Sequence, residues 1–369
     1  SNGLEKRPKL RFPGFDEPYK QCRIGDIYAE RSQRGASDME LLSVTMNDGV
    51  MPRSEIEGKD NSSEDKSNYK VVLTGDMVYN SMRMWQGANG ISPCDGIVSP
   101  AYTVLMPKIP ISNGYFAAFF KSPNLINEFR KNSQGMTSDT WNLKYPQIET
   151  IKVCIPALSE QNRVADMLRT LERRIAKQAQ LVDNLKKYKR GLIKLVFEKV
   201  MSEAHYQLPL SDLCISISSG RTTVNESNGR YPLFGSTGIV GMTNTIEHDG
   251  DIVMVARVGA NAGKVNFFSG RCGVTDNTLV IRVKENTIHP KFLAYFLENF
   301  DLHKLIFGSG QPLVTGGQLK KIQSPVIAYK AQLLITRSLE SLDRIIGTQD
   351  TYMEKLIQLK SGLMQRLFI

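Results

Sequence analysis

Apolar residues recur at alternating steps of three and four along two long stretches of the chain. This spacing is that of a heptad repeat, which places the apolar residues along one stripe of an α-helix. Each stripe is polar at the same two steps, first at Gln178 and Lys189 and then at Gln349 and Lys360. The positions that we expect along a helix–helix seam are Leu168, Leu171, Ile175, Gln178, Val182 and Leu185, and then Leu339, Leu342, Ile346, Gln349, Met353 and Leu356.

The two stretches are copies of each other, because Ile148–Phe197 aligns with Leu319–Phe368 without a gap at a constant offset of 171. Identical pairs include Gln161/Gln332, Leu168/Leu339, Leu171/Leu342, Arg173/Arg344, Ile175/Ile346, Leu185/Leu356, Lys189/Lys360, Gly191/Gly362 and Phe197/Phe368. One such helix is more often part of a single core, but two copies with matching polar positions favour partners, since a Gln facing a Gln fixes register. Neither helix, about 38 residues and about 57 Å long, buries its stripe alone. We therefore expect an antiparallel two-helix coiled coil that acts as a spacer.

The segment from about Tyr19 to about Gln147 has a different pattern. Its apolar runs are short and are separated by turn residues, which is typical of a mainly-β domain. We expect one helix at Tyr115–Asn132, and a long exposed loop at the polar run Gly58–Asn68. The expected strands lie within Cys22–Tyr28, Leu41–Val44, Tyr69–Leu73, Met77–Asn80 and Tyr102–Met106.

The segment from Leu208 to about Gln318 repeats this plan. Ile24–Ile27 matches Leu210–Leu213, Gly75–Val78 matches Gly250–Val253, and Phe116, Ala118 and Phe120 match Phe292, Ala294 and Phe296. The expected fold class is α+β with pseudo-two-fold duplication. Two mainly-β domains, residues 1–147 and 201–318, are separated by helical spacers at residues 148–200 and 319–369.

The basic composition of the chain favours an anionic binding partner. With 47 Lys and Arg against 37 Asp and Glu the net charge is +10, although charge alone does not identify the partner. The five cysteines are scattered and form no C-x-x-C pair, as in a reducing cytosol. No apolar run approaches about 18 residues and no signal peptide opens the chain, so we expect a cytoplasmic protein.

The sequence contains few patterns that resemble a known catalytic motif. Gly259–Lys264 resembles a phosphate loop but has three residues between its glycines, where a Walker loop has four followed by Lys and then Ser or Thr. Asp48, Glu57 and Lys59 have a loose nuclease-like spacing, yet solvated loop charges are the more common origin of such a pattern. The four histidines show no ligand spacing with the cysteines. We expect no catalytic site and no bound metal.

The candidate DNA-binding residues lie in paired, polar, Gly-rich loops that recur in both segments. Arg reads guanine edges and Asn or Gln read adenine, while hydroxyl groups and backbone amides hold phosphates. For any one of these residues, a role in a turn or on the surface is more common than base contact. The prediction therefore depends on the recurrence of the loops in both segments, in which Met82–Trp85 occupies the same place as Ala256–Gly259. The candidates are Arg83, Trp85, Gln86, Asn89, Gln134, Thr137, Ser138 and Thr140, and in the second segment Arg221, Arg257, Asn261, Lys264, Ser309, Gln311 and Thr315.

This layout resembles the specificity subunit of type I restriction–modification enzymes across essentially the whole chain. The resemblance lies in Arg11–Phe15, in Ile24–Ile27, in the helix lead Pro156–Gln161 and in the closing Gly362–Phe368. It also lies in the repeated helix ends Lys189–Leu192 and Lys360–Leu363. One departure is the second helix lead, Pro325–Gln332, where Ala331 replaces the usual acidic residue.

The resemblance implies two target-recognition domains, each reading one half of a split double-stranded DNA sequence. The helices would separate the two domains and would bind methyltransferase subunits. Those subunits would supply S-adenosylmethionine and the adenine chemistry, and restriction or motor subunits would supply ATP, Mg and cleavage. A cytosolic scaffold or RNA-binding adaptor, and an enzyme with unrecognised carboxylates, are the alternatives.

Overall fold

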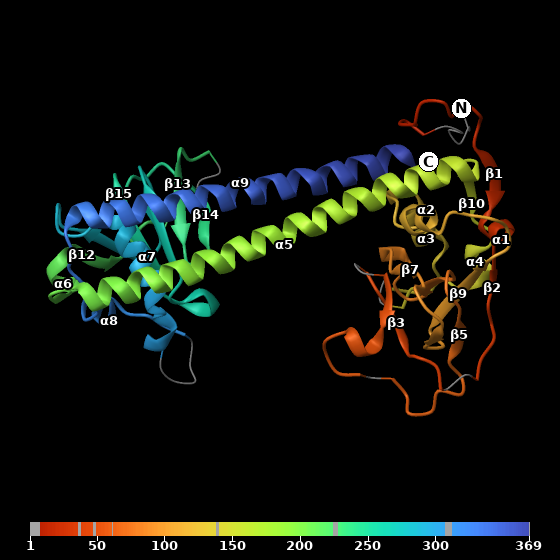
Figure 1. Cartoon of the computed structure of the whole chain (residues 1–369), viewed down its shortest axis with the longest axis horizontal. Helices are drawn as coiled ribbons and strands as arrows, with labels where there is room; N and C mark the ends of the chain where they lie inside the picture. The colour runs from red at the N-terminus through yellow and green to blue at the C-terminus, as the bar shows by residue number, and fades with distance from the viewer. Residues whose placement is uncertain are drawn as a thin grey trace. The chain divides into compact units, whose positions relative to one another are not determined.

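Two long helices, α5 (Leu158–Glu203) and α9 (Tyr329–Leu367), run through both of the units into which the chain divides (Figure 1). Unit 1 comprises Ser1–Gln178 and Tyr352–Ile369, and unit 2 comprises Ala179–Thr351. This computed structural model describes residues 8–35, 38–46, 49–60, 62–137, 140–223, 228–306 and 312–368.

Unit 1 contains a four-stranded antiparallel sheet in the order β2-β9-β6-β7. Strand pairs β3-β4, β5-β8 and β1-β10 are also antiparallel. The strands are β1 (Lys20–Arg23), β2 (Tyr28–Glu30), β3 (Leu42–Thr45), β4 (Gly49–Pro52), β5 (Lys70–Val72), β6 (Met77–Asn80), β7 (Asn89–Ile91), β8 (Gly96–Val98), β9 (Tyr102–Pro107) and β10 (Lys152–Ile155). The shorter helices are α1 (Ile24–Ile27), α2 (Asn113–Phe119), α3 (Pro123–Asn132) and α4 (Tyr145–Ile148).

Unit 2 has an equivalent four-stranded antiparallel sheet, in the order β12-β18-β15-β16, beside a three-stranded sheet β14-β13-β17. Its strands are β11 (Gln207–Pro209), β12 (Cys214–Ser219), β13 (Tyr231–Gly235), β14 (Gly238–Thr243), β15 (Asp251–Ala256), β16 (Val265–Ser269), β17 (Gly273–Val274), β18 (Thr278–Val283) and β19 (Gln323–Pro325). Its shorter helices are α6 (Leu210–Leu213), α7 (Pro290–Phe300) and α8 (Gly316–Lys320). Because β11 pairs with β19 as β1 pairs with β10, the predicted repetition of one plan is present in the fold.

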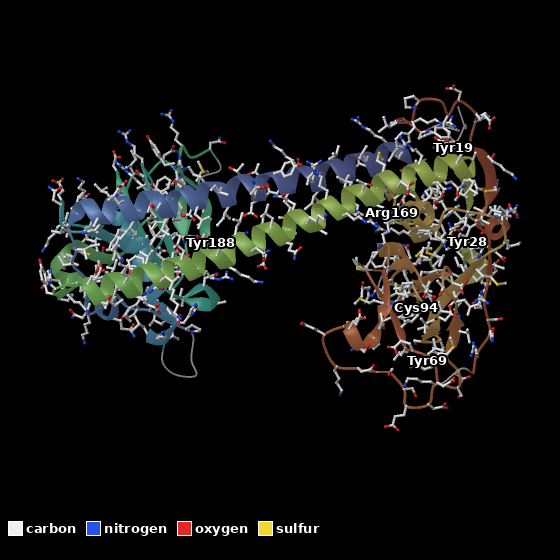
Figure 2. The ribbon with its side chains drawn as sticks, viewed as in Figure 1. Tyr19, Tyr28, Tyr69, Cys94, Arg169 and Tyr188 are labelled. Carbon is white, nitrogen blue, oxygen red and sulfur yellow. The ribbon has the colours of Figure 1, made fainter. Side chains whose placement is uncertain are left out.

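The ends of the long helices belong to the hydrophobic cores of the units. In unit 1, Leu168 of α5 and Phe368 after α9 are buried in one cluster with the aromatic residues of α2. In unit 2, Phe197 of α5 and Leu339 of α9 are buried with α7. Burying a large apolar side chain contributes about 1.5–3 kcal/mol, so these contacts fix each globular part to both helices. Figure 2 shows the side chains of the described residues on the ribbon.

Within each unit the two helices pair in opposite directions. In unit 2, Lys186 of α5 ion-pairs with Asp350 of α9 at 2.9 Å, and Lys189 ion-pairs with Asp343 at 2.8 Å. The later residue of α5 pairs with the earlier residue of α9, so the two helices are antiparallel there. In unit 1 the ion pair Glu172–Lys360, at 2.7 Å, is the repeat-related counterpart of Asp343–Lys189. All twelve predicted seam residues are buried or half-buried.

Two predicted elements are corrected by the structure. The single helix expected at Tyr115–Asn132 is two helices, because Pro123 starts α3 and Ser122 caps it by accepting a hydrogen bond from the Leu125 backbone at 3.4 Å. The strand expected at Cys22–Tyr28 is interrupted by the helical turn α1.

The predicted match of Phe116 with Phe292 is also wrong, by one residue. The N-cap residues of α2 and α7, Ser112 and His289, show the true alignment. Tyr115 therefore corresponds to Phe292, and Phe119 to Phe296. The helix-end phenylalanines support this: Phe368 packs on Tyr115 (5.3 Å) and Phe119 (5.5 Å), and Phe197 on Phe292 (5.2 Å) and Phe296 (5.7 Å), measured between ring centroids.

Candidate nucleic-acid interface

The structure brings together the two loops predicted to bind DNA in unit 1. The first loop joins β6 to β7 through a 3₁₀ turn at Met84–Gln86, and the second follows α3. The backbone N–H of Leu143 donates to the carbonyl of Ser81 at 2.8 Å. The rings of Trp85 and Trp141 pack edge to face, with centroids 5.2 Å apart. A polar surface with an aromatic pair is therefore built from two segments that are far apart in the sequence.

Most of the predicted residues of these loops are accessible. Arg83, Gln134, Thr137 and Thr140 are exposed, and Trp85 and Gln86 are half-buried. The Thr140 hydroxyl already donates a hydrogen bond within the protein, to the Thr137 carbonyl at 2.9 Å, and this bond stabilises the turn. Ser138 lies outside the described residues.

The prediction for Asn89 is wrong, because its side chain is fully buried. Its Nδ2 donates to the carbonyl of Gly87 at 3.1 Å. This bond stabilises the left-handed backbone at Gly87, which has a φ of 87°. Asn89 shapes the loop and does not face DNA.

Sequence reasoning missed Trp141 and Arg130. The Arg130 guanidinium lies over the Trp141 ring at 5.4 Å from its centroid, and Trp141 contacts Trp85. The sequence did place both residues, one basic and one aromatic, on either side of the loop already predicted at Gln134–Thr140, and this could have identified them. Arginine and aromatic faces are both common in nucleic-acid sites.

The corresponding loops of unit 2 meet in the same way. The first contains a 3₁₀ turn at Gly259–Asn261 between β15 and β16. The backbone N–H of Val314 donates to the carbonyl of Arg257 at 2.9 Å, and that of Gly259 to Pro312 at 3.1 Å. Val314 lies 171 positions after Leu143, so this contact is the repeat of the one in unit 1.

The predicted residues of unit 2 differ in accessibility. Lys264 and Arg221 are exposed, while Asn261 and Arg257 are half-buried. Arg257 also donates from Nη1 to Ser219 Oγ at 3.3 Å. Ser309 and Gln311 lie outside the described residues.

Thr315 has a structural role that the sequence prediction did not include. It is the N-cap of α8, where its hydroxyl accepts a hydrogen bond from the Gln318 backbone at 3.2 Å. The Gln318 side-chain oxygen accepts in return from the Thr315 backbone at 2.8 Å, which completes a capping box. The hydroxyl is therefore occupied within the protein.

The loop contacts correct the expected equivalence of Arg83 and Arg257. Arg257 accepts a hydrogen bond from the Val314 backbone as Ser81 accepts one from the Leu143 backbone. The counterpart of Arg257 is therefore Ser81, two residues before Arg83. The two loops therefore share a backbone plan but present different side chains at each position.

Glu247 orders the loop that carries Arg221. Its carboxylate accepts hydrogen bonds from the Arg221 backbone at 2.9 Å and from the Thr222 hydroxyl at 2.6 Å. Burial alone raises the pKa of Glu247, but the hydrogen bonds from Thr222, Arg221 and Val274 outweigh it and lower the pKa below its ordinary value. The ionised carboxylate holds the backbone while the Arg221 side chain remains exposed.

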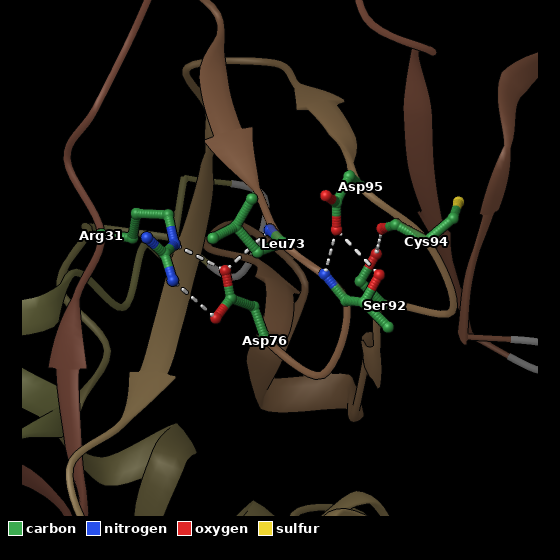
Figure 3. Close-up of polar contacts among 7 residues, drawn as sticks. Arg31, Leu73, Asp76, Ser92, Cys94 and Asp95 are labelled. Carbon is green, nitrogen blue, oxygen red and sulfur yellow. Dashed lines mark hydrogen bonds and ion pairs between the residues drawn. The ribbon is translucent and has the colours of Figure 1, made fainter.

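A second carboxylate, Asp76, anchors the start of β6 in unit 1 (Figure 3). Arg31 donates to it from Nε at 2.6 Å and from Nη2 at 3.2 Å, and the Leu73 backbone donates at 2.9 Å. Asp95 accepts from both the backbone and the hydroxyl of Thr74 beside it. These bonds hold the turn that leads into the strand before Arg83, so their role is to position the loop.

The described members of the nuclease-like candidate set lie at the protein surface. Glu57 and Lys59 are exposed, and Asp48 lies outside the described residues. In the described ranges, no group of three or more His, Cys, Asp or Glu side chains is placed to hold a metal ion. No helix in the described part of the chain is long and apolar enough to cross a membrane.

Comparison with known proteins finds relatives that are specificity subunits of type I restriction enzymes. The chain is 24% identical over 352 residues to the type I restriction enzyme MjaVIII specificity subunit of Methanocaldococcus jannaschii, which covers 82% of this chain and 81% of that protein. It is 28% identical over 123 residues to the EcoprrI specificity subunit of Escherichia coli. This shorter match covers 33% of the chain and only 30% of the relative.

Solved structures share the fold. The chain superposes on a type I restriction–modification S subunit from M. genitalium with a TM-score of 0.65 at 14% identity, covering 98% of this chain and 99% of that one. The HsdS subunit of Thermoanaerobacter tengcongensis gives a TM-score of 0.53 at 15% identity, with 97% of each chain covered. The model of the type I restriction modification DNA specificity domain matches twice, at residues 17–187 and 207–356. These two matches take in most of the chain, which therefore belongs to the family of type I restriction–modification specificity subunits.

Proposed function

We propose that this chain recognises a bipartite double-stranded DNA target, one half with each of its domains at residues 1–147 and 201–318. The observation that carries the proposal is the repeated loop contact, Leu143 to Ser81 in unit 1 and Val314 to Arg257 in unit 2. The same backbone arrangement presents Arg83, Trp85 and Gln86 in one unit. In the other it presents Asn261 and Lys264. Two copies of one scaffold with different side chains are suited to reading two different sequences.

The charge and chemistry of the exposed loop residues support a DNA partner. Arg83, Arg221 and Lys264 are exposed cations that can neutralise phosphates or reach guanine edges. Gln86 and Gln134 offer amides suited to adenine. The accessible part of the predicted set is therefore polar and basic in both units.

The long helices would form an antiparallel coiled coil that spaces the two domains. The burial of the twelve seam positions and the repeat-related ion pairs Glu172–Lys360 and Asp343–Lys189 support this arrangement. The chain would itself be non-catalytic and cytoplasmic. Methyltransferase subunits would bring S-adenosylmethionine, and restriction or motor subunits would bring ATP and Mg.

The test is a gel-shift assay with the purified chain, with and without its methyltransferase subunits, on random duplex DNA and on duplex RNA. We expect a salt-sensitive shift on DNA that becomes sequence-selective when the subunits are present. Mapping methylated adenines in cells carrying the system should then reveal one split sequence. Equal binding to RNA, or turnover by the isolated chain, would contradict the proposal and favour the adaptor or enzyme alternatives.

A further inference from the structure

A short N-terminal segment, Leu10–Phe12, fastens the start of α5 to the end of α9 in unit 1. The Arg11 guanidinium donates from Nε and Nη2 to the two carboxylate oxygens of Glu160, each at 2.8 Å. The backbone N–H of Leu10 donates to the Arg366 carbonyl at 3.0 Å, and the Arg163 guanidinium lies 5.4 Å from the centroid of Phe12. We call Leu10–Phe12 the N-terminal clasp. It covers a site formed by the first turns of one helix and the last turn of the other.

The repeat places a corresponding site in unit 2, where α5 ends and α9 begins. At the constant offset of 171, the clasp-contacting residues Glu160, Arg163 and Arg366 correspond to Ala331, Leu334 and Leu195. All three exchanges replace a charged residue with an apolar one, although Arg366 contacts the clasp through its backbone carbonyl and not through its side chain. Leu195 and Leu334 are 65% and 58% exposed, so the charged clasp site of unit 1 has become an uncovered apolar surface in unit 2.

This surface lies beside a groove of about 730 Å³ between the last turns of α5 and the first turns of α9. Leu334 follows Ala331 by three residues and Leu195 precedes Lys199 by four, and both Ala331 and Lys199 line the groove. Residues with these spacings are neighbours on a helix surface, so the exposed leucines flank the groove. Its apolar walls include Val196, Val200, Val326, Ile327, Ala331 and Ile335.

We propose that this groove in unit 2 is a docking site for an extended, aromatic-bearing apolar peptide segment of a partner protein. The occupant follows from the corresponding site of unit 1, which already holds such a segment, Leu10–Phe12, from this same chain. In unit 2, Ala331 stands where unit 1 has Glu160, the carboxylate that pairs with Arg11. The partner segment therefore needs an apolar residue at the position that Arg11 occupies in the clasp. A groove of this volume is in the range of sites that enclose ligands, and exposed apolar patches on soluble proteins mark such contacts.

The experiment uses the full chain and two fluorescent peptides, residues 8–15 in their native sequence and the same peptide with Arg11→Leu. We expect saturable binding of the Arg11→Leu peptide to the wild-type chain, measured by fluorescence anisotropy, and weaker binding of the native peptide. The double variant Leu195→Arg/Leu334→Arg should weaken binding about tenfold or more, because it places two charges beside the apolar groove. Leu181→Arg is the matched control, an exposed leucine of α5 outside the groove, and should leave binding unchanged.

A reversal of preference provides the second arm. Ala331→Glu restores the carboxylate found at Glu160, so the native peptide should then bind more tightly than the Arg11→Leu peptide. The proposal is overturned if no peptide binds in a saturable manner, or if the double variant binds like the Leu181→Arg control. It is equally overturned if the wild-type chain prefers the native peptide, or if the leucine variants only abolish self-association of the chain.

Discussion

Gln161 of α5 and Gln332 of α9 make the same hydrogen bonds, each inside its own unit. The Gln161 side-chain oxygen accepts from the backbone of Ser112 at 3.0 Å, and that of Gln332 from the backbone of His289 at 2.7 Å. Ser112 and His289 are the N-cap residues of α2 and α7. Each glutamine also donates from Nε2 to a carbonyl five residues before it, at 3.0 Å. The repeat therefore fixes each globular part to the start of a long helix through one buried amide.

Replacing either glutamine should destabilise its unit. Gln332→Leu leaves the part-buried N–H of His289 without its acceptor, which costs about 1–3 kcal/mol in the free energy of unfolding. Gln161→Leu should cost a similar amount. Urea unfolding monitored by circular dichroism measures both, with the exposed Gln180→Leu as the matched control. A loss no larger than that of Gln180→Leu would mean that these bonds contribute little.

The ion pair of the N-terminal clasp should be strongly coupled. Glu160 has a side chain only 1% exposed, so Arg11→Ala leaves a buried carboxylate without its cation and should lower the free energy of unfolding by about 3 kcal/mol or more. Arg11→Ala combined with Glu160→Gln should recover part of this loss, because no uncompensated charge remains. Additive effects of the two changes in a double-mutant cycle would contradict a direct coupling.

Arg83→Ala and Arg257→Ala should relax different halves of the proposed DNA target. If each guanidinium contacts a base edge, each change costs about 1–3 kcal/mol of binding free energy and loosens one half-site. Methylation mapping in cells that carry each variant reports the affected bases. Arg271→Ala removes one positive charge at a residue ion-paired with Asp249 and serves as the control. Loosening of the same bases by both variants would exclude independent reading of two half-sites.

The interval between the half-sites should follow the length of the helices. Four residues inserted after Gln178 lengthen α5 by about 6 Å, nearly two base pairs of B-DNA, and turn the following segment by about 40°. A matching insertion after Gln349 should keep the two seams paired. We expect the double insertion to recognise the same half-sequences with a gap about one or two base pairs longer. An unchanged gap in the methylation map would show that the helices do not set the interval.

Acidification should weaken unit 2 through His248 and His289. Burial lowers the pKa of each below its ordinary value of 6.5, so each ring takes up its proton at a lower pH in the folded chain than in the unfolded chain. As the pH falls through 6.5, the unfolded chain takes up protons that the folded chain resists, and the free energy of unfolding decreases. His248→Gln and His289→Gln should each flatten the decrease between about pH 7.5 and 5.5 in urea titrations, relative to wild type. A slope unchanged in both variants would assign the dependence to other groups.

Some of the candidate interface could be read from the sequence and some could not. The recurrence of the loops indicated where Arg83 and Lys264 lie, because turn residues and charge are visible locally. The burial of Asn89 and the capping role of the Thr315 hydroxyl depend on neighbours that only the folded backbone brings close. Trp141 joined the site through its contact with Trp85, far away in the sequence.

The sequence by itself determined the two long helices and the duplication, because a helical repeat is a periodic property of consecutive residues and a constant offset needs no structure to detect. Only the tertiary structure decided which residues of the two halves are equivalent. A pattern match tolerates a slip of one position, as in Phe116 against Phe292, whereas packing does not. Phe368 contacts Tyr115 and Phe119 because a buried ring fits only the helix face that is turned toward it.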